Sequence, residues 1–227
     1  EKASGKILYN DTDIYEEYER MKYEIGFVPQ QDLLRLSDTV YDTLANAAEM
    51  KLPRSIKDDE REQKILDVLN RFGLSREKES LVSKLSGGQK RRAAIAGIMA
   101  MKPDVLVLDE PAAGLDPVGR NLIFDAIEEY RAVEGATIII VSHSMEDMAV
   151  RCHRVIVMSD GKVVADGTRD EVFSDADKLV SVGLDVPEIT KLAALLASRG
   201  FDFGKTVYTV EDAADVICRA LSGGDCK

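Results

Sequence analysis

Short runs of apolar residues alternate along this chain with segments of helical periodicity. Residues 25–28, 105–108 and 137–141 are dominated by β-branched and aliphatic side chains, whereas residues 58–72 carry apolar side chains three and four positions apart. Unbroken apolar strands separated by helices are typical of a parallel sheet buried under helices. The pattern therefore predicts an α/β fold with a mostly parallel sheet.

Several predicted helices have recognisable ends. Asp116 is a suitable N-cap, Pro117 suits the first helical position, and Gly135 suits the end of the helix that starts there. Thr168 and Glu171 have the spacing of a capping box. The remaining expected elements are a strand at 6–9 with a turn at Asn10-Asp11, a helix at about 15–22, a hairpin at 155–165, and tail helices at 187–198 and 209–221.

Polar residues follow the apolar strands directly. Asp109 and Glu110 come after 105–108, and His143 comes soon after 137–141. Because ligands bind beyond the carboxyl ends of parallel strands, we expect these side chains at one sheet edge. Gln30 follows the strand at 25–28 and Pro29, where a polar turn residue is the plainest interpretation of the position alone.

A second feature is the sequence Leu85-Ser86-Gly87-Gly88-Gln89 at the start of an apolar helix. Such a start offers exposed N–H groups beside the positive end of the helix dipole, which favours an anion. An anion site together with paired acids indicates a nucleotide phosphate with Mg²⁺.

Composition narrows the function classes. The 227 residues carry a formal net charge of -11, which argues against attraction to nucleic acid by the overall field. Residues 90–92 are basic, and we expect them to support bound phosphate or the helix itself. Three cysteines without a metal-type spacing fit a reduced, cytosolic setting. No apolar run approaches the roughly 20 residues of a membrane-spanning helix.

With these segments on the page, a family resemblance can be stated. Residues 85–89 resemble the signature motif of ABC-type ATPases, 105–110 resemble their Walker B strand, and 114–116 resemble their D-loop. The order and spacing of all three agree. The resemblance implies a P-loop-NTPase-like ABC ATPase core with an inserted helical subdomain and a small C-terminal helical tail.

The resemblance also implies roles for the acids and for the polar residues after the strands. Asp109 would hold Mg²⁺ through water, Glu110 would polarise the attacking water, and His143 would contact the γ-phosphate. Gln30, in the Q-loop position, would sense Mg²⁺ and contact the transport partner, and Asp116 would couple two sites across a dimer.

The signature residues imply a partner. In the resembled family two domains pair head to tail, and each ATP lies between one P-loop and the other domain's signature motif. Ser86, Gly87, Gly88 and Gln89 would thus contact a nucleotide held by a second ABC ATPase subunit, identical or different. A transmembrane transporter subunit would be the other partner, with this chain at the cytoplasmic face of the membrane.

Residues 93–221 are similar to the ATPase subunits of energy-coupling factor (ECF) transporters, which power uptake of vitamins or of cobalt and nickel. Segments 26–32 and 47–53 look more like exporter-type ABC proteins, so import and export both stay open. We predict an ABC ATPase domain at 1–167, with the helical subdomain at about 31–102, and a C-terminal tail at 168–227 that is a candidate dimerisation region.

A P-loop is expected but not found in the 227 residues. Residues 200–206 come near the pattern Gly-x₄-Gly-Lys-[Ser/Thr], but they have three residues between the glycines and an extended continuation. We therefore expect an ABC domain without its first part, with a sheet edge or apolar groove left for another segment to cover. The alternative function is a P-loop-less regulatory module that cannot hydrolyse ATP alone. A third class, the soluble ABC proteins of translation or DNA repair, would bring inserted coiled-coil arms or twin ABC domains, and the sequence shows neither.

Overall fold

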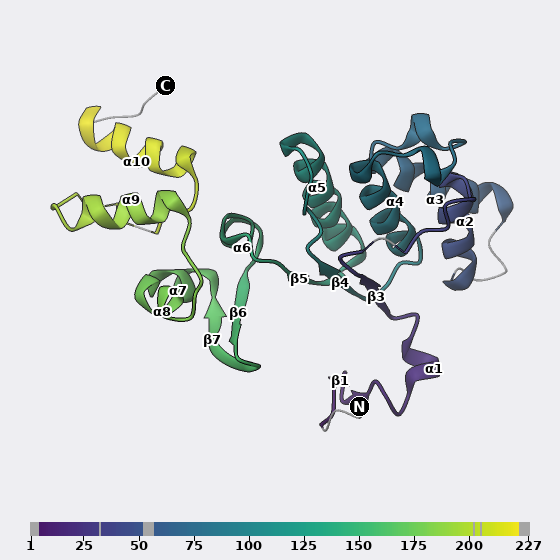
Figure 1. Ribbon diagram of the computed structural model, residues 1–227, viewed down its shortest axis with the longest axis horizontal. Coiled ribbons are helices and arrows are strands. Elements are labelled where there is room, and N and C mark those ends of the chain that lie inside the picture. The colour runs from purple at the N-terminus through teal and green to yellow at the C-terminus, as the bar shows by residue number, and fades with distance from the viewer. Residues whose placement is uncertain (1–4, 32, 52–56, 202, 205, 223–227) are drawn as a thin grey trace. The chain divides into compact units, whose positions relative to one another are not determined.

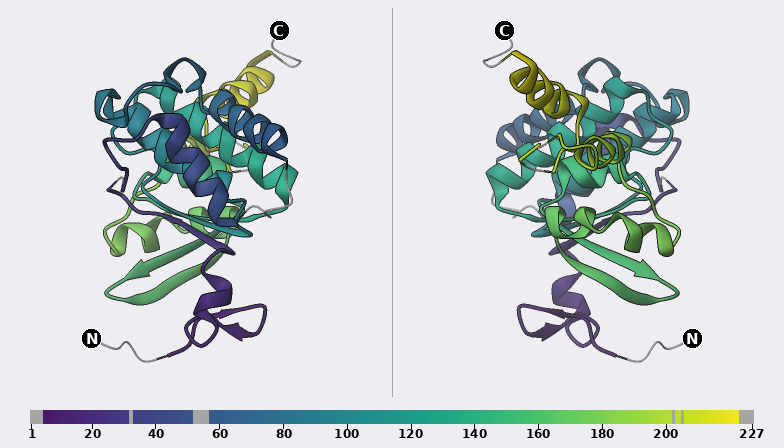
Figure 2. Two further views of the ribbon diagram at one scale, coloured as in Figure 1. Left: turned by 90° about the vertical axis from the view of Figure 1, so that its right-hand side faces the viewer. Right: turned by 90° about the vertical axis from the view of Figure 1, so that its left-hand side faces the viewer.

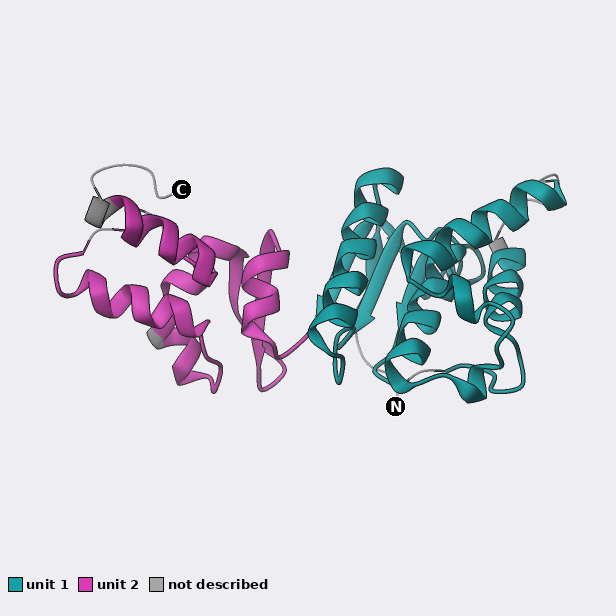
Figure 3. Cartoon of the chain, turned by 90° about the horizontal axis from the view of Figure 1, so that it is seen from above, with its two compact units in different colours: residues 1–141 teal, residues 142–227 magenta. Residues whose placement is uncertain are grey.

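The computed structural model describes residues 5–31, 33–51, 57–201, 203–204 and 206–222. The chain divides into two compact units, Glu1–Val141 and Ser142–Lys227 (Figure 3). Each unit is described by itself below. The division into an ATPase domain at 1–167 and a tail at 168–227 stays a prediction. Asp32 and residues 52–53, which belong to the exporter-like segments, lie outside the described residues.

Three parallel strands form the sheet of the first unit. They are β3 (Ile25–Val28), β4 (Val105–Asp109) and β5 (Thr137–Val141), hydrogen-bonded in that order (Figure 1). All three predicted strands and their parallel direction are confirmed. Because parallel strands need long crossovers, the helices between them supply the layer that covers the sheet.

Helices pack over one face of this sheet and extend away from it (Figure 1). They are α2 (Val40–Lys51), α3 (Asp58–Arg71), α4 (Gly87–Ala100) and α5 (Pro117–Glu134), with the 3₁₀ turns Ser75–Glu77 and Val82–Lys84. One apolar cluster joins these elements, and its fully buried members include Leu44, Phe72, Ile95, Leu106 and Ile123. Helices α2 to α4 fall within the helical segment predicted at about 31–102.

The helix ends follow the sequence prediction. Asp116 caps α5, since its Oδ1 accepts a hydrogen bond of 2.6 Å from the Gly119 amide. Pro117 occupies the first helical position, and Gly135 ends the helix with a left-handed φ of 69°. A side chain at that φ would be strained, which explains the glycine.

The two faces of the sheet differ in exposure. Leu106 and Leu108 are completely buried under the helices. Phe27, Val107 and Ile139 are neighbours across the strands on the opposite face, where Phe27 is 54% and Ile139 is 46% exposed. This face of the sheet therefore exposes apolar side chains, whereas the other is covered by helices.

The segment before β3 differs from its prediction. The strand expected at 6–9 is only Leu8–Tyr9 (β1), and it pairs antiparallel with Thr12–Asp13 (β2) across the Asn10-Asp11 turn. The helix expected at about 15–22 is one turn, Tyr18–Met21 (α1), with only Met21 buried. Few apolar side chains are available here to hold a longer element.

The second unit begins with α6 (Met145–Arg151) and a long two-stranded ribbon, visible as the twisted hairpin in Figure 2. Its strands are β6 (Arg154–Ser159) and β7 (Lys162–Thr168), which confirms the predicted hairpin. The Thr168–Glu171 capping box is also present, at the start of the next helix. The helices that follow are α7 (Arg169–Ser174), α8 (Ala176–Ser181), α9 (Glu188–Ala197) and α10 (Val210–Ser222).

Tyr208 links two distant parts of this unit. Its hydroxyl donates a 2.7 Å hydrogen bond to Asp170 Oδ1, and its ring packs edge-on against Phe173 with the Arg169 guanidinium over its face. The donated bond, followed by the charge of Arg169, lowers the pKa of Asp170, while burial raises the pKa of Tyr208 to about 12. The segment before α10 is thereby fixed to α7.

Candidate functional site

The start of α4 has the geometry of an anion site. Ser86 is the N-cap: its Oγ accepts from the Gln89 amide at 3.3 Å, and Gln89 Oε1 accepts from the Ser86 amide at 2.9 Å. Ser86 and Gly87 are exposed, and a Cβ built on Gly87 meets no atom within 4 Å. The first turn therefore presents its N–H groups to an open space that can admit a phosphate.

The second glycine has a different neighbour. A Cβ on Gly88 would approach Leu115 Cδ2 to 3.1 Å, which is closer than most real Cβ contacts. Leu115 belongs to the segment Gly114-Leu115-Asp116, in which Gly114 has φ 71°. Gly88 thus permits the signature helix and the D-loop segment to touch. The Asp116 carboxylate itself caps α5, and its proposed role across a dimer stays a prediction.

The paired acids lie at the carboxyl end of β4, as predicted. Asp109 is the last residue of the strand and pairs with Val141 in β5, and the Glu110 amide extends the ladder with a 2.8 Å bond to the Val141 carbonyl. Glu110 has a left-handed φ of 48°. A non-glycine residue in that region costs about 1–3 kcal/mol, a strain that is concentrated at functional sites in proteins.

Arg91, in the first turns of α4, connects these parts. Its side chain is buried, and its guanidinium donates to main-chain carbonyls that come from the ends of two strands. The acceptors are the carbonyl oxygens of Pro29 (Nη1, 2.6 Å), Gln30 (Nη1, 3.5 Å), Asp109 (Nη2, 2.5 Å), Glu110 (Nη2, 3.2 Å) and Pro111 (Nε, 3.3 Å). The sequence indicated only a basic cluster at 90–92, because nothing in the spacing shows which side chain turns inward.

Arg91 therefore brings the main chains of Gln30, Asp109 and Glu110 together around one side chain. The Gln30 residue is itself exposed after β3. His143 is exposed as well and lies two residues beyond Val141, in the second unit. Its proposed γ-phosphate contact stays a prediction.

The donor types at the end of β4 suit Mg²⁺. Carboxylate oxygens are hard ligands, and Mg²⁺ keeps several waters and binds substrate phosphates rather than an all-protein cage. Asp109 and Glu110 therefore fit a site that the phosphates of a nucleotide complete.

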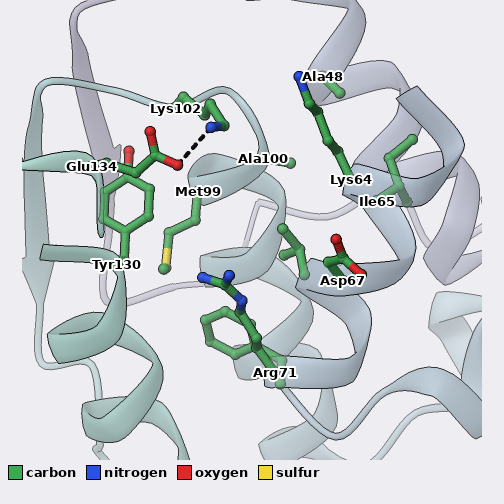
Figure 4. Close-up of a pocket in the computed structure, with 12 residues that line it drawn as sticks. Ala48, Lys64, Ile65, Asp67, Arg71, Met99, Ala100, Lys102, Tyr130 and Glu134 are labelled. Atoms are coloured by element: carbon green, nitrogen blue, oxygen red, sulfur yellow. Dashed lines mark hydrogen bonds and ion pairs between the residues drawn. The ribbon is translucent and has the colours of Figure 1, made fainter. Parts of the chain in front are cut away.

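A cavity of about 130 Å³ lies elsewhere in the first unit, among α2, α3, α4 and α5 (Figure 4). Met99 and Tyr130 line it, with Lys102 paired to Glu134 at its rim. The Tyr130 hydroxyl donates to the Pro103 carbonyl at 2.7 Å, and burial raises the pKa of this phenol. The residues that line the cavity include none of the candidate site residues, so it is separate from the proposed nucleotide chemistry.

Comparisons with known proteins show the family to which this chain belongs. The ABC transporter family matches residues 1–113. The energy-coupling factor transporter ATP-binding protein EcfA2 of Clostridium tetani is 40% identical over 215 residues, covering 92% of this chain and 74% of that protein. EcfA2 of Clostridioides difficile is 38% identical and covers 97% of this chain and 78% of its own length. The chain belongs to the ECF transporter ATP-binding proteins, a group of ABC ATPases.

Solved structures support the assignment. The protein cbiO1 of Clostridium perfringens, described as part of the ABC transporter complex cbiONQ, has a TM-score of 0.66 and 34% identity, covering 86% of this chain and 77% of its own. The ATP-binding subunit of another ABC transporter has a TM-score of 0.67 at 24% identity, which shows the shared fold alone. The ABC ATPase fold predicted from the motifs is thus confirmed, and homologues in this family hydrolyse ATP for transport.

Proposed function

We propose that this ECF-type ABC ATPase supplies half of a composite nucleotide site and couples ATP hydrolysis to uptake of a vitamin or metal ion. The observation that carries the proposal is the arrangement around Arg91. This side chain holds the acids at the end of β4 and the Q-loop main chain to the helix that begins with the capped Ser86 and the open Gly87.

The resemblance implies tasks at a nucleotide beside the end of β4, whose P-loop would have to lie outside the 227 residues. There Glu110 would accept a hydrogen bond from the attacking water and polarise it, while Asp109 would orient the metal's water ligands. When bound, Mg²⁺ neutralises the charge that develops on the phosphates during in-line transfer. Gln30 reports occupancy to the transport partner, and His143 donates to the γ-phosphate.

The signature residues act on the nucleotide of a partner subunit. Ser86 donates its hydroxyl, and Gly87, Gly88 and Gln89 offer main-chain N–H groups at the positive end of α4. The 227 residues contain no Gly-x₄-Gly-Lys-[Ser/Thr] sequence, so the loop that wraps the phosphates has to come from outside them. A second ABC ATPase subunit that bears a P-loop meets this need.

The setting follows from this partnership. A transmembrane transporter subunit anchors the pair at the cytoplasmic face of the membrane, and residues 168–227 contribute to dimerisation. None of the helices in the described part of the chain is long and apolar enough to cross a bilayer.

ATP turnover by the chain mixed with a P-loop-bearing ECF ATP-binding subunit tests the proposal. We expect turnover above that of either protein alone, and loss of the gain in Ser86→Ala. The alternative is a regulatory module that binds the partner without hydrolysis at its own acids. In that case the mixture forms, but its turnover does not exceed that of the added subunit alone.

A further inference from the structure

The guanidinium of Arg91 occupies an unusual environment for a charged group. The residue is only 5% exposed, and at least five hydrogen bonds run from its three nitrogens to main-chain carbonyls. Burying a charge is unfavourable unless hydrogen bonds replace its hydration. Here the negative ends of the main-chain carbonyl dipoles replace the hydration of the guanidinium. They can do so only while the loops after β3 and β4 hold their positions.

These carbonyls belong to segments far apart in the sequence. Those of Pro29 and Gln30 follow β3, that of Asp109 ends β4, and those of Glu110 and Pro111 come directly after it. The donor is on α4, five residues after its N-cap Ser86. A planar fork of five N–H groups can satisfy this set, whereas the single ammonium group of lysine has three donors that leave from one atom.

The contact with Glu110 is the most informative. This residue has a left-handed backbone with φ 48°, and the direction of its side chain depends on that backbone conformation. Its carbonyl accepts from Arg91, and its amide is held by Val141. That carbonyl also accepts from the Ala113 amide at 3.2 Å, so removing the guanidinium would take away one of the hydrogen bonds that hold a strained residue.

We propose that Arg91 is a positioning residue, which locks the main chains of Gln30 and Glu110 to the helix that carries Ser86. This inference rests on the proposed function, because Glu110 and Gln30 act on a nucleotide only there.

The first test measures hydrogen exchange in the full chain, without nucleotide. In Arg91→Lys we expect faster exchange at the amides of Glu110 and Ala113, whose acceptors are the Val141 and Glu110 carbonyls. Exchange in the centre of α5 should be unchanged. The matched control is Arg131→Lys, since Arg131 is an exposed arginine paired with Glu128 and its replacement should leave every loop amide as it was.

The second test separates positioning from folding in the mixture with a P-loop-bearing subunit. We expect Arg91→Lys and Arg91→Gln to lower kcat by about tenfold to hundredfold, because the start of α4 that carries Ser86 is then less well held against the sheet, and a displacement of about 1 Å has an effect of that size. KM for ATP should change by less than about threefold, because Arg91 does not touch the nucleotide in this account. Both kcat and KM are measured well below the melting temperature of each variant.

The outcomes are distinguishable. Unchanged loop exchange together with unchanged kcat in Arg91→Lys overturns the inference, as does a kcat loss that matches the loss of folded protein. If the wild-type mixture shows no turnover, the proposed function fails, and the exchange measurement still decides whether Arg91 holds the Glu110 loop.

Discussion

Replacing Ser86 tests whether the start of α4 holds a phosphate, but the residue has two tasks that must be separated. Its hydroxyl accepts from the Gln89 amide as the N-cap, and by our proposal it also donates to a partner's nucleotide. Ser86→Ala removes both. Ser86→Asp keeps an acceptor for the cap and adds a charge that favours the helix dipole but repels phosphate.

We therefore expect the two variants to rank in one order for stability and in the opposite order for nucleotide affinity. Loss of the cap in Ser86→Ala should lower the free energy of unfolding by about 1 kcal/mol, while Ser86→Asp should stay within a few tenths of a kcal/mol of wild type. For binding, losing a hydrogen bond to a charged group costs about 1.5–3 kcal/mol, or roughly tenfold to hundredfold in Kd. Ser86→Asp adds repulsion of about 1 kcal/mol or more and should bind more weakly than Ser86→Ala.

Urea denaturation gives the stability order, and calorimetry of Mg-ATP binding to the chain with a P-loop-bearing subunit gives the affinity order. Thr168→Ala is the matched control, because Thr168 caps α7 through the same capping-box geometry in the other unit. Thr168→Ala should lower the free energy of unfolding through loss of the cap, without changing the affinity for Mg-ATP. If Ser86→Asp binds Mg-ATP as tightly as wild type, no phosphate lies at the start of α4 and the reasoning is refuted.

Three further predictions concern packing and titration. Leu106→Ala should lower the free energy of unfolding by about 3 kcal/mol and Ile139→Ala by less than half of that, because only the first side chain is fully buried; equal losses in urea denaturation would mean that the open face is covered. Tyr208→Phe should raise the pKa of Asp170 toward its ordinary value in an NMR titration. Because folding lowers the pKa of Asp170, the hydrogen bond stabilises the fold fully above the ordinary carboxyl pKa of about 4, and this stabilisation is lost as pH falls through the lowered pKa. If the pKa of Asp170 is the same in Tyr208→Phe as in wild type, the hydrogen bond is not present. Burial, followed by a nearby carboxylate, raises the pKa of the Cys152 thiol. Its alkylation at pH 8 should therefore be faster in urea than in the folded chain, and equal rates would contradict its burial.

Much of the sheet and its helices was predictable because local and long-range preferences agree there. The apolar runs at β3 and β4 lack the polar alternation of a half-solvated antiparallel strand, which favours a parallel sheet, although the structure leaves Phe27 exposed on the open face. Asp116, Pro117 and Gly135 each favour one helix end by their own chemistry, and the structure uses all three.

Other features depend on contacts that the sequence does not encode locally. The hairpin partner Thr12–Asp13 is two polar residues long, too short to give a periodic pattern. The role of Arg91 depends on which of three consecutive basic residues faces the sheet, and helical geometry decides that only once α4 is docked. The bond from Tyr208 to Asp170 spans 38 residues, and neither residue has a neighbouring signal.

The central claim is that this chain completes a nucleotide site whose P-loop lies outside its 227 residues. The most direct measurement is calorimetry of Mg-ATP with the chain alone and then with a P-loop-bearing ECF ATP-binding subunit. The account predicts no binding heat for the chain alone, and tighter Mg-ATP binding by the mixture than by the added subunit alone. Tight binding by the chain alone would contradict it, because some loop within these residues would then have to hold the phosphates.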